Sequence, residues 1–245
     1  MTHLSVNVNK IALLRNARDI GIPSVLQSVE IALEAGAHGI TVHPRPDQRH
    51  IRNSDVYEIS KLLNSWKNIE FNIEGNPFEK PLLDLARNVL PSQCTLVPDS
   101  PNAWTSDHGW DINKDATRLI PVINELKKLG IRVSLFMDPD PEAIELAVSL
   151  GIDRIELYTE PYAKAFATDL ESAVLSKYVE SASVAQSSGV LINAGHDLNL
   201  INLFKFLNTV ENVQEVSIGH ALIADALVLG LDAAVKKYLL VMKSC

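Results

Sequence analysis

Eight short apolar runs alternate with longer runs of helical periodicity along this chain, and this alternation limits the possible folds more than any other feature. The short runs predict strands at residues 4–8, 39–43, 69–73, 94–97, 132–137, 154–158, 190–194 and 216–219. The longer runs predict helices at 25–35, 56–66, 81–89, 116–129, 141–150, 171–187, 200–209, 221–229 and 231–242. Alternating strands and helices are typical of parallel α/β folds. We therefore expect a single (β/α)8 TIM barrel with extra helices over residues 1–245, with an open doubly wound sheet as the alternative.

Composition limits the partners and the compartment. The net charge is −8 and no basic stripe is visible, which argues against nucleic-acid binding. No apolar run reaches the roughly 18 residues of a membrane span, and the first residues lack a signal-peptide pattern. Cys94 and Cys245 are the only cysteines, so no disulfide framework or zinc cluster is indicated. We expect a cytoplasmic protein without a membrane segment.

Four of the seven histidines stand at or just after predicted strand ends: His43, His50, His196 and His220. In an α/β barrel the carboxyl ends of the strands share one rim, where active sites lie. Histidine exchanges protons near neutral pH. One such residue is more often structural, but four on one rim predict an acid–base active site.

Strand alternation places polar side chains on the inner faces of the first and third strands. Asn7 and Asn9 share one face of the first strand, and Lys10 follows it. For the Lys10 amine, a phosphate contact or a surface salt bridge is favoured over a Schiff base. Glu70 and Glu74 share a face of the third strand. We expect Glu70 to be a catalytic carboxylate, with a structural ion pair as the alternative, and Glu74 to lie beyond the strand.

The last two strands indicate a phosphate site. Residues 217–220 read Ser-Ile-Gly-His and lead directly into a predicted helix. A helix N-terminus offers free N–H groups, and glycine lets a ligand approach the backbone. Residues 193–196, Asn-Ala-Gly-His, end the neighbouring strand. Cationic side chains that could bind such a ligand lie early in the chain. Each of them either binds phosphate or lies on the solvated surface: Arg15, Arg18, Arg45 and Arg49.

Several blocks together resemble the pyridoxine 5′-phosphate synthase family. They are residues 7–18 (NVNKIALLRNAR), 39–45 (GITVHPR) with 49–51 (RHI), 190–196 (VLINAGH) and 217–220 (SIGH), supported by 96–98 (LVP) and 133–136 (VSLF). The resemblance implies an octamer built from dimers. It also implies condensation of 1-deoxy-D-xylulose 5-phosphate with 3-amino-2-oxopropyl phosphate to give pyridoxine 5′-phosphate, without metal or organic cofactor.

The resemblance also implies roles for individual residues. His43 and Glu70 match the family's catalytic bases, and His196 matches its proton donor. The positions matching those that hold the deoxyxylulose phosphate are Asn9, Lys10, Arg45, His50 and Thr105. The positions matching those that hold the amino-ketone phosphate are Asn7, Arg18, Asp197, Gly219 and His220.

This chain departs from the family form at several of these positions. Asn9-Lys10 stands where Asp-His is expected, and Tyr158 and Glu160 replace His and Gly. Asp197 replaces a glycine beside the amino-ketone phosphate, so its carboxylate is expected to point away. The hypothesis is a divergent branch that keeps the reaction. The alternatives are another phosphosugar enzyme, such as an epimerase or aldolase, and a non-catalytic paralogue that binds phosphorylated metabolites.

Overall fold

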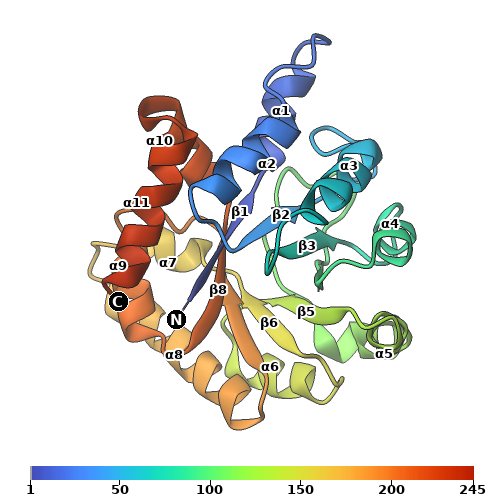
Figure 1. Ribbon diagram of the computed structural model, residues 1–245. Coiled ribbons are helices and arrows are strands. Elements are labelled where there is room, and N and C mark those ends of the chain that lie inside the picture. Colours follow the sequence, from blue (N-terminus) through green and yellow to red (C-terminus); the bar gives the residue numbers. More distant parts are fainter. Residues whose placement is uncertain (1) are drawn as a thin grey trace.

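The computed structural model describes residues 2–245, and eight parallel strands close into a barrel in chain order (Figure 1). The strands are β1 (His3–Asn7), β2 (Gly39–Val42), β3 (Glu70–Gly75), β4 (Gln93–Leu96), β5 (Arg132–Met137), β6 (Arg154–Leu157), β7 (Leu191–Ala194) and β8 (Val213–Ile218). Because β1 pairs with both β2 and β8, the sheet has no free edge. The predicted (β/α)8 barrel is confirmed, and the open sheet is excluded.

Helices surround this barrel on the outside (Figure 1). They are α1 (Asn9–Asn16), α2 (Val25–Glu34), α3 (Asn53–Leu63), α4 (Leu82–Val89), α5 (Ile112–Lys128), α6 (Pro141–Val148), α7 (Glu160–Ala165), α8 (Glu171–Ser187), α9 (Leu203–Thr209), α10 (His220–Leu229) and α11 (Leu231–Lys243). Two short helices were not predicted, α1 and α7. Both follow a strand end directly, and their eight and six residues are too few for a clear apolar period.

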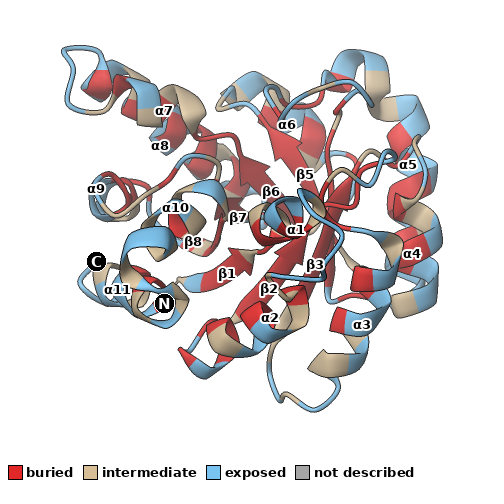
Figure 2. Ribbon diagram, turned by 90° about the horizontal axis from the view of Figure 1, so that it is seen from above, coloured by how far each residue is buried: buried red, intermediate tan, exposed pale blue. Residues whose placement is uncertain are grey.

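The strands bury both faces, but the two faces differ in polarity. The outward face carries the apolar residues that pack under the helices, such as Ile40, Val42 and Ile73, all fully buried. Figure 2 shows this burial along the strands and the exposed outer sides of the helices. Strand alternation therefore gives the helices an apolar surface and leaves the polar residues for the barrel interior.

The barrel interior is filled by hydrogen-bonded polar side chains. The Ser5 and Thr41 hydroxyls lie 2.7 Å apart, Thr95 Oγ1 donates to Asn72 Oδ1 at 3.0 Å, and Asn193 Nδ2 reaches Gln93 Oε1 across the barrel at 3.5 Å. Barrel interiors more often contain branched apolar residues. These groups are shielded from water and pair with one another, whereas Ser134 Oγ and Glu156 Oε2 have no partner among the described residues.

Gly195 is required where β7 ends. A Cβ at this position would lie 2.3 Å from the carbonyl oxygen of Ser217 on β8, which is far inside contact distance. Glycine therefore lets the backbone of residues 195–198 turn close over the neighbouring strand and carry His196 to the rim.

Within residues 2–245, no helix combines the length and the apolar character needed to cross a membrane.

Candidate active site

A cavity of about 360 Å³ opens at the carboxyl ends of the strands. Its lining includes most of the predicted site residues, namely Asn7, Asn9, Lys10, His43, Arg45, His50, Thr105, His196, Asp197, Gly219 and His220. These residues come from the ends of β1, β2, β7 and β8 and from the loop after β4. Two predicted residues, Glu70 and Arg18, do not line the cavity.

The first strand ends earlier than predicted, and Asn9 is not on a strand face. β1 ends at Asn7, and Asn9 begins α1. Asn7 Oδ1 accepts a hydrogen bond from the Asn9 backbone N–H at 3.0 Å, and Asn9 Oδ1 accepts one from the His43 backbone N–H at 2.9 Å. The two amides therefore fix the turn between β1 and α1 and tie it to the end of β2. Lys10 follows in the first turn of α1 and faces the cavity.

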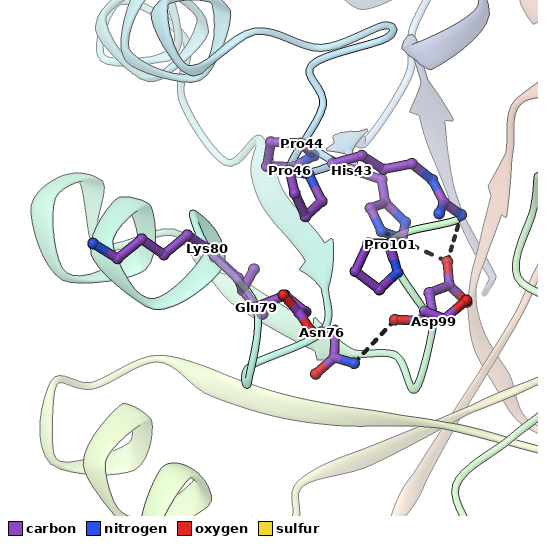
Figure 3. Close-up of a pocket in the computed structure, with 11 residues that line it drawn as sticks. His43, Pro44, Pro46, Asn76, Glu79, Lys80, Asp99 and Pro101 are labelled. Atoms are coloured by element: carbon purple, nitrogen blue, oxygen red, sulfur yellow. Dashed lines mark hydrogen bonds and ion pairs between the residues drawn. The ribbon is translucent and has the colours of Figure 1, made fainter. Parts of the chain in front are cut away.

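His43 lies between two carboxylates. Its Nδ1 is 3.6 Å from Glu74 Oε2, and its Nε2 is 3.9 Å from Asp99 Oδ2. Asp99 in turn accepts hydrogen bonds from Arg45 Nη2 at 2.5 Å and from Ser106 Oγ at 2.9 Å. Figure 3 shows Asp99 beside His43 at a second, small hollow of about 10 Å³. His43 borders both hollows. Its Nδ1 is near Glu74, which lines the large cavity, and its Nε2 is near Asp99, which lines the small one.

Glu70 lies at the opposite end of the barrel. It is the first residue of β3, and Arg132 Nη1 donates to its Oε1 at 3.2 Å while Nη2 contacts Oε2. Burial opposes ionisation of Glu70, but the Arg132 guanidinium outweighs it and lowers the pKa of this carboxyl. The geometry thus corresponds to the structural ion pair that the sequence left as the alternative.

Glu74 is the third-strand carboxylate that lines the cavity. The expectation that it lies beyond the strand is wrong, because β3 continues to Gly75 and Glu74 is buried there. Along a strand every second side chain points into the barrel, so each two-residue step reaches the next layer of interior side chains. The four-residue step from Glu70 to Glu74 therefore moves a carboxylate from one mouth of the barrel toward the other.

His50 is a neutral hydrogen-bond donor. Its Nδ1 accepts from the Ile51 backbone N–H at 2.9 Å, so the proton of the neutral ring is on Nε2. Burial, followed by the charges of His43, Arg45, Lys10 and Arg49, lowers the pKa of His50 to about 3. At neutral pH this ring can donate Nε2–H to a ligand without carrying charge.

Asn16 and Arg15 hold the loop that carries His50. The Asn16 side-chain amide donates to the carbonyls of Gln48, Arg49 and His50 at 3.3, 3.1 and 2.8 Å. Arg15 is buried and pairs with Asp55 at 2.5 Å. The structure thus gives Arg15 a packing role, whereas Arg18 is exposed beyond the end of α1. A phosphate contact of Arg18 stays a prediction.

The loop after β4 folds over the cavity and is held by two of the predicted arginines. Arg45 Nη1 and Arg49 Nη1 each donate to the Ala103 carbonyl at 3.0 Å, and Arg49 Nη2 donates to the Pro101 carbonyl at 2.9 Å. This brings Thr105 Oγ1 within 3.0 Å of His196 Nε2. Thr105 therefore joins the site, and Trp104 and Ser106 line the cavity beside it.

His196 packs against aromatic side chains. Its ring centre is 5.3 Å from that of Tyr158 and 6.3 Å from that of Phe136. Its Nδ1 is 3.5 Å from Asp197 Oδ2. The Asp197 carboxylate thus lies beside the catalytic candidate and lines the cavity, so the expectation that it points away is wrong.

Glu156 adds a buried carboxyl to the floor of the cavity. Burial is the main cause of its raised pKa, and the negative charges of Glu74 and Glu215 act in the same direction. The raised pKa favours the protonated carboxyl, which is the form that can donate a proton. Glu156 Oε2 has no hydrogen-bond partner among the described residues.

The end of β8 forms the other side of the cavity. Gly219 precedes α10, and His220 is its first residue. A Cβ on Gly219 would lie 3.1 Å from Asn7 Cγ, so the backbone here and the Asn7 amide are in close contact. Free N–H groups of a helix start, a histidine and an amide meet here, which suits a phosphate.

Among residues 2–245, no cluster of three or more His, Cys, Asp or Glu side chains has the arrangement of a metal site. The groups that meet at the cavity are instead acids, bases, amides and cations. A closed eight-stranded barrel with such a cavity at its carboxyl rim defines a (β/α)8 barrel enzyme of the acid–base type.

Comparison with known proteins identifies the family. The sequence model for the pyridoxal phosphate biosynthesis protein PdxJ matches residues 4–244. A pyridoxine 5′-phosphate synthase of Albidiferax ferrireducens is 52% identical over 97% of this chain and 96% of its own length. One from Xanthomonas axonopodis pv. citri is 52% identical over 99% of this chain and 97% of its own length. The chain belongs to the PdxJ family.

Solved structures of lower similarity support the fold alone. Phosphoribosyl anthranilate isomerase of Thermotoga maritima aligns with a TM-score of 0.64 and 16% identity, covering all of both chains. The 3-keto-L-gulonate-6-phosphate decarboxylase of Vibrio cholerae aligns with a TM-score of 0.66 and 9% identity, over 99% of this chain and 98% of its own.

Proposed function

We propose that this protein is a pyridoxine 5′-phosphate synthase. It condenses 1-deoxy-D-xylulose 5-phosphate with 3-amino-2-oxopropyl phosphate and releases pyridoxine 5′-phosphate, phosphate and water. The observation that carries this proposal is that the family-matching residues of β1, β2, β7 and β8 meet around one cavity. Relatives about half identical over nearly their whole length carry the same name, which supports it.

Two ends of the cavity suit the two phosphates. Lys10, Arg45 and His50 gather near the β2 end, and Gly219 and His220 gather at the start of α10. Holding both substrates in one cavity turns a reaction between two molecules into an effectively intramolecular one, which contributes up to roughly 7–11 kcal/mol in favourable cases.

The condensation moves protons at each step, and the site offers groups for both directions. We assign proton abstraction to His43 with Glu74 beside its Nδ1, in place of Glu70. His196 serves as proton donor from the opposite side of the cavity, and the buried Glu156 is a second acid at its floor. Attack of the amine on the ketone, loss of water and phosphate, and an aldol-type closure of the ring need such alternating roles.

We make three further proposals, the first two from the composition and organisation of the sequence and the third from the family resemblance. The chain acts as one domain, works in the cytoplasm, and assembles as a homo-octamer of dimers. Large exposed apolar side chains on α10 are consistent with assembly, with Leu227 and Val228 77% and 86% exposed. Light scattering on the purified protein tests the octamer, and a monomer in solution would contradict it.

The direct test is to mix purified protein with both substrates and follow pyridoxine 5′-phosphate together with phosphate release. Product from both substrates, and from neither alone, is the expected result. Binding of both substrates without product would indicate the non-catalytic paralogue. If neither binds, the proposed function is refuted.

A further inference from the structure

Asp197 occupies a backbone conformation that favours glycine. Its φ is +65°, and the turn around it is closed by the Leu198 N–H donating to the Gly195 carbonyl at 2.9 Å. Asn202 Nδ2 also donates to the Asp197 carbonyl at 3.2 Å. The backbone is thus fixed from both sides, and the direction of the Asp197 side chain is set by the turn rather than by its own contacts.

This fixed direction places the carboxylate against His196. The distance from Asp197 Oδ2 to His196 Nδ1 is 3.5 Å, and Nδ1 is buried without a hydrogen-bond partner among residues 2–245. The other ring nitrogen, Nε2, is 3.0 Å from Thr105 Oγ1. The ring therefore has a hydroxyl at one nitrogen and a carboxylate near the other, and a small rotation would complete an ion-paired hydrogen bond.

We propose that Asp197 is a positioning residue that orients the His196 ring and favours its protonated, proton-donating form. The inference rests on the proposed function, in which His196 is the proton donor, and goes beyond it by giving Asp197 a role that a glycine cannot perform. The arrangement resembles the carboxylate–imidazole pairs that fix a tautomer in other acid–base sites.

The charges around the pair act on it together. The nearby His196 ring is the main cause of the lowered pKa of Asp197; burial opposes it, and His220 and Lys10 contribute in the same direction as His196. Tyr158 packs on the His196 ring from β6, and the carboxylates of Glu160, Asp107 and Asp138 lie near enough to act on Tyr158. Glu156 faces the same cavity from below. Of these acids, Asp197 alone is in contact with the ring.

The test measures the protonation of His196 directly, without substrate. Hydrogen–deuterium exchange at the imidazole Cε1, read by mass spectrometry in the His196 peptide, gives the midpoint pH of this ring in an assembly of any size. Asp197→Asn keeps the side-chain shape, and Asp197→Gly suits the positive φ. Both side chains of the pair are partly exposed, so we expect the midpoint to fall by about 0.2–0.7 pH unit in each variant. Glu160→Gln, which removes a rim carboxylate not in contact with His196, is the matched control and should leave the midpoint unchanged.

Activity and stability complete the experiment. The alkaline limb of the kcat–pH profile should move to lower pH in both Asp197 variants, while Asp197→Gly should unfold at the same temperature as the wild type or higher. An unchanged midpoint in both variants would overturn the proposal even if the wild type makes product. A shifted midpoint in a protein that makes no product would keep the ion pair but refute its catalytic role together with the proposed function.

Discussion

The assignment of the third-strand carboxylate can be tested by comparing Glu70→Gln with Glu74→Gln. Both changes remove one negative charge from the inner face of β3 and keep the side-chain size. Glu74 contacts His43 at 3.6 Å and lines the cavity, whereas Glu70 pairs with Arg132 at the far mouth of the barrel. We expect Glu74→Gln to remove activity and Glu70→Gln to affect stability.

The magnitudes follow from these two environments. Removing a positioned acid–base group costs about 10²–10⁴-fold in rate, so kcat of Glu74→Gln should fall at least about 100-fold. The Glu70 and Arg132 side chains are 30% and 24% exposed, between a surface pair and a buried one. Discounting for solvent screening, we expect Glu70→Gln to lose about 1–2 kcal/mol of unfolding free energy, which for about 245 residues is a few degrees in Tm. Its kcat should stay within about threefold of the wild type.

The pH dependence provides a second check on Glu70. Arg132 holds its pKa below the ordinary value, so the ion pair stabilises the fold above that value and the stabilisation is lost as the pH falls through the folded-state pKa. The stability difference between Glu70→Gln and the wild type should therefore disappear in acid. Steady-state kinetics and urea denaturation of both variants measure these effects. A Glu70→Gln enzyme that unfolds like the wild type but has lost 100-fold in kcat, beside an active Glu74→Gln, would refute the reasoning.

Three further predictions concern other parts of the site. Gly195→Ala places a methyl group 2.3 Å from the Ser217 carbonyl and should lower the unfolding free energy by about 3 kcal/mol in urea denaturation; a loss under about 1 kcal/mol would contradict the close contact. Asn16→Ala removes the donor to three loop carbonyls and should raise KM for the deoxyxylulose phosphate about 5–10-fold at nearly constant kcat; an unchanged KM would show that the loop holds itself. The pKa of His50 is lowered to about 3, so the wild type should lose about 2 kcal/mol of stability between pH 7 and 5 through this group, and His50→Gln should lose correspondingly less. Equal losses in the two proteins would show that His50 titrates in the folded protein as it does in the unfolded chain, which would contradict the lowered pKa.

The alternation of short apolar runs with runs of helical periodicity was sufficient to predict the barrel. Residues 132–137 and 171–187 were predicted with the limits of β5 and α8, because long periodic runs and glycine at helix ends carry local signals. The short helices α1 and α7 lacked such signals. Consequently Asn9 was expected on a strand, although it is the first residue of α1 and bonds the His43 backbone.

The sequence determined which chemistry gathers at the rim, because strand ends in an alternating α/β chain share one side of the molecule. It therefore indicated His43, His50, His196 and His220. It did not determine the depth of a side chain along the barrel axis or its partner. Alternation gives Glu70 and Glu74 the same face, and only the register of eight strands places one beside Arg132 and the other beside His43. The direction of the Asp197 side chain likewise depends on a left-handed turn, which is closed by the hydrogen bond from Leu198 to Gly195 and held by Asn202. Proton transfer depends on such contacts, which exist only after distant parts of the chain have packed together.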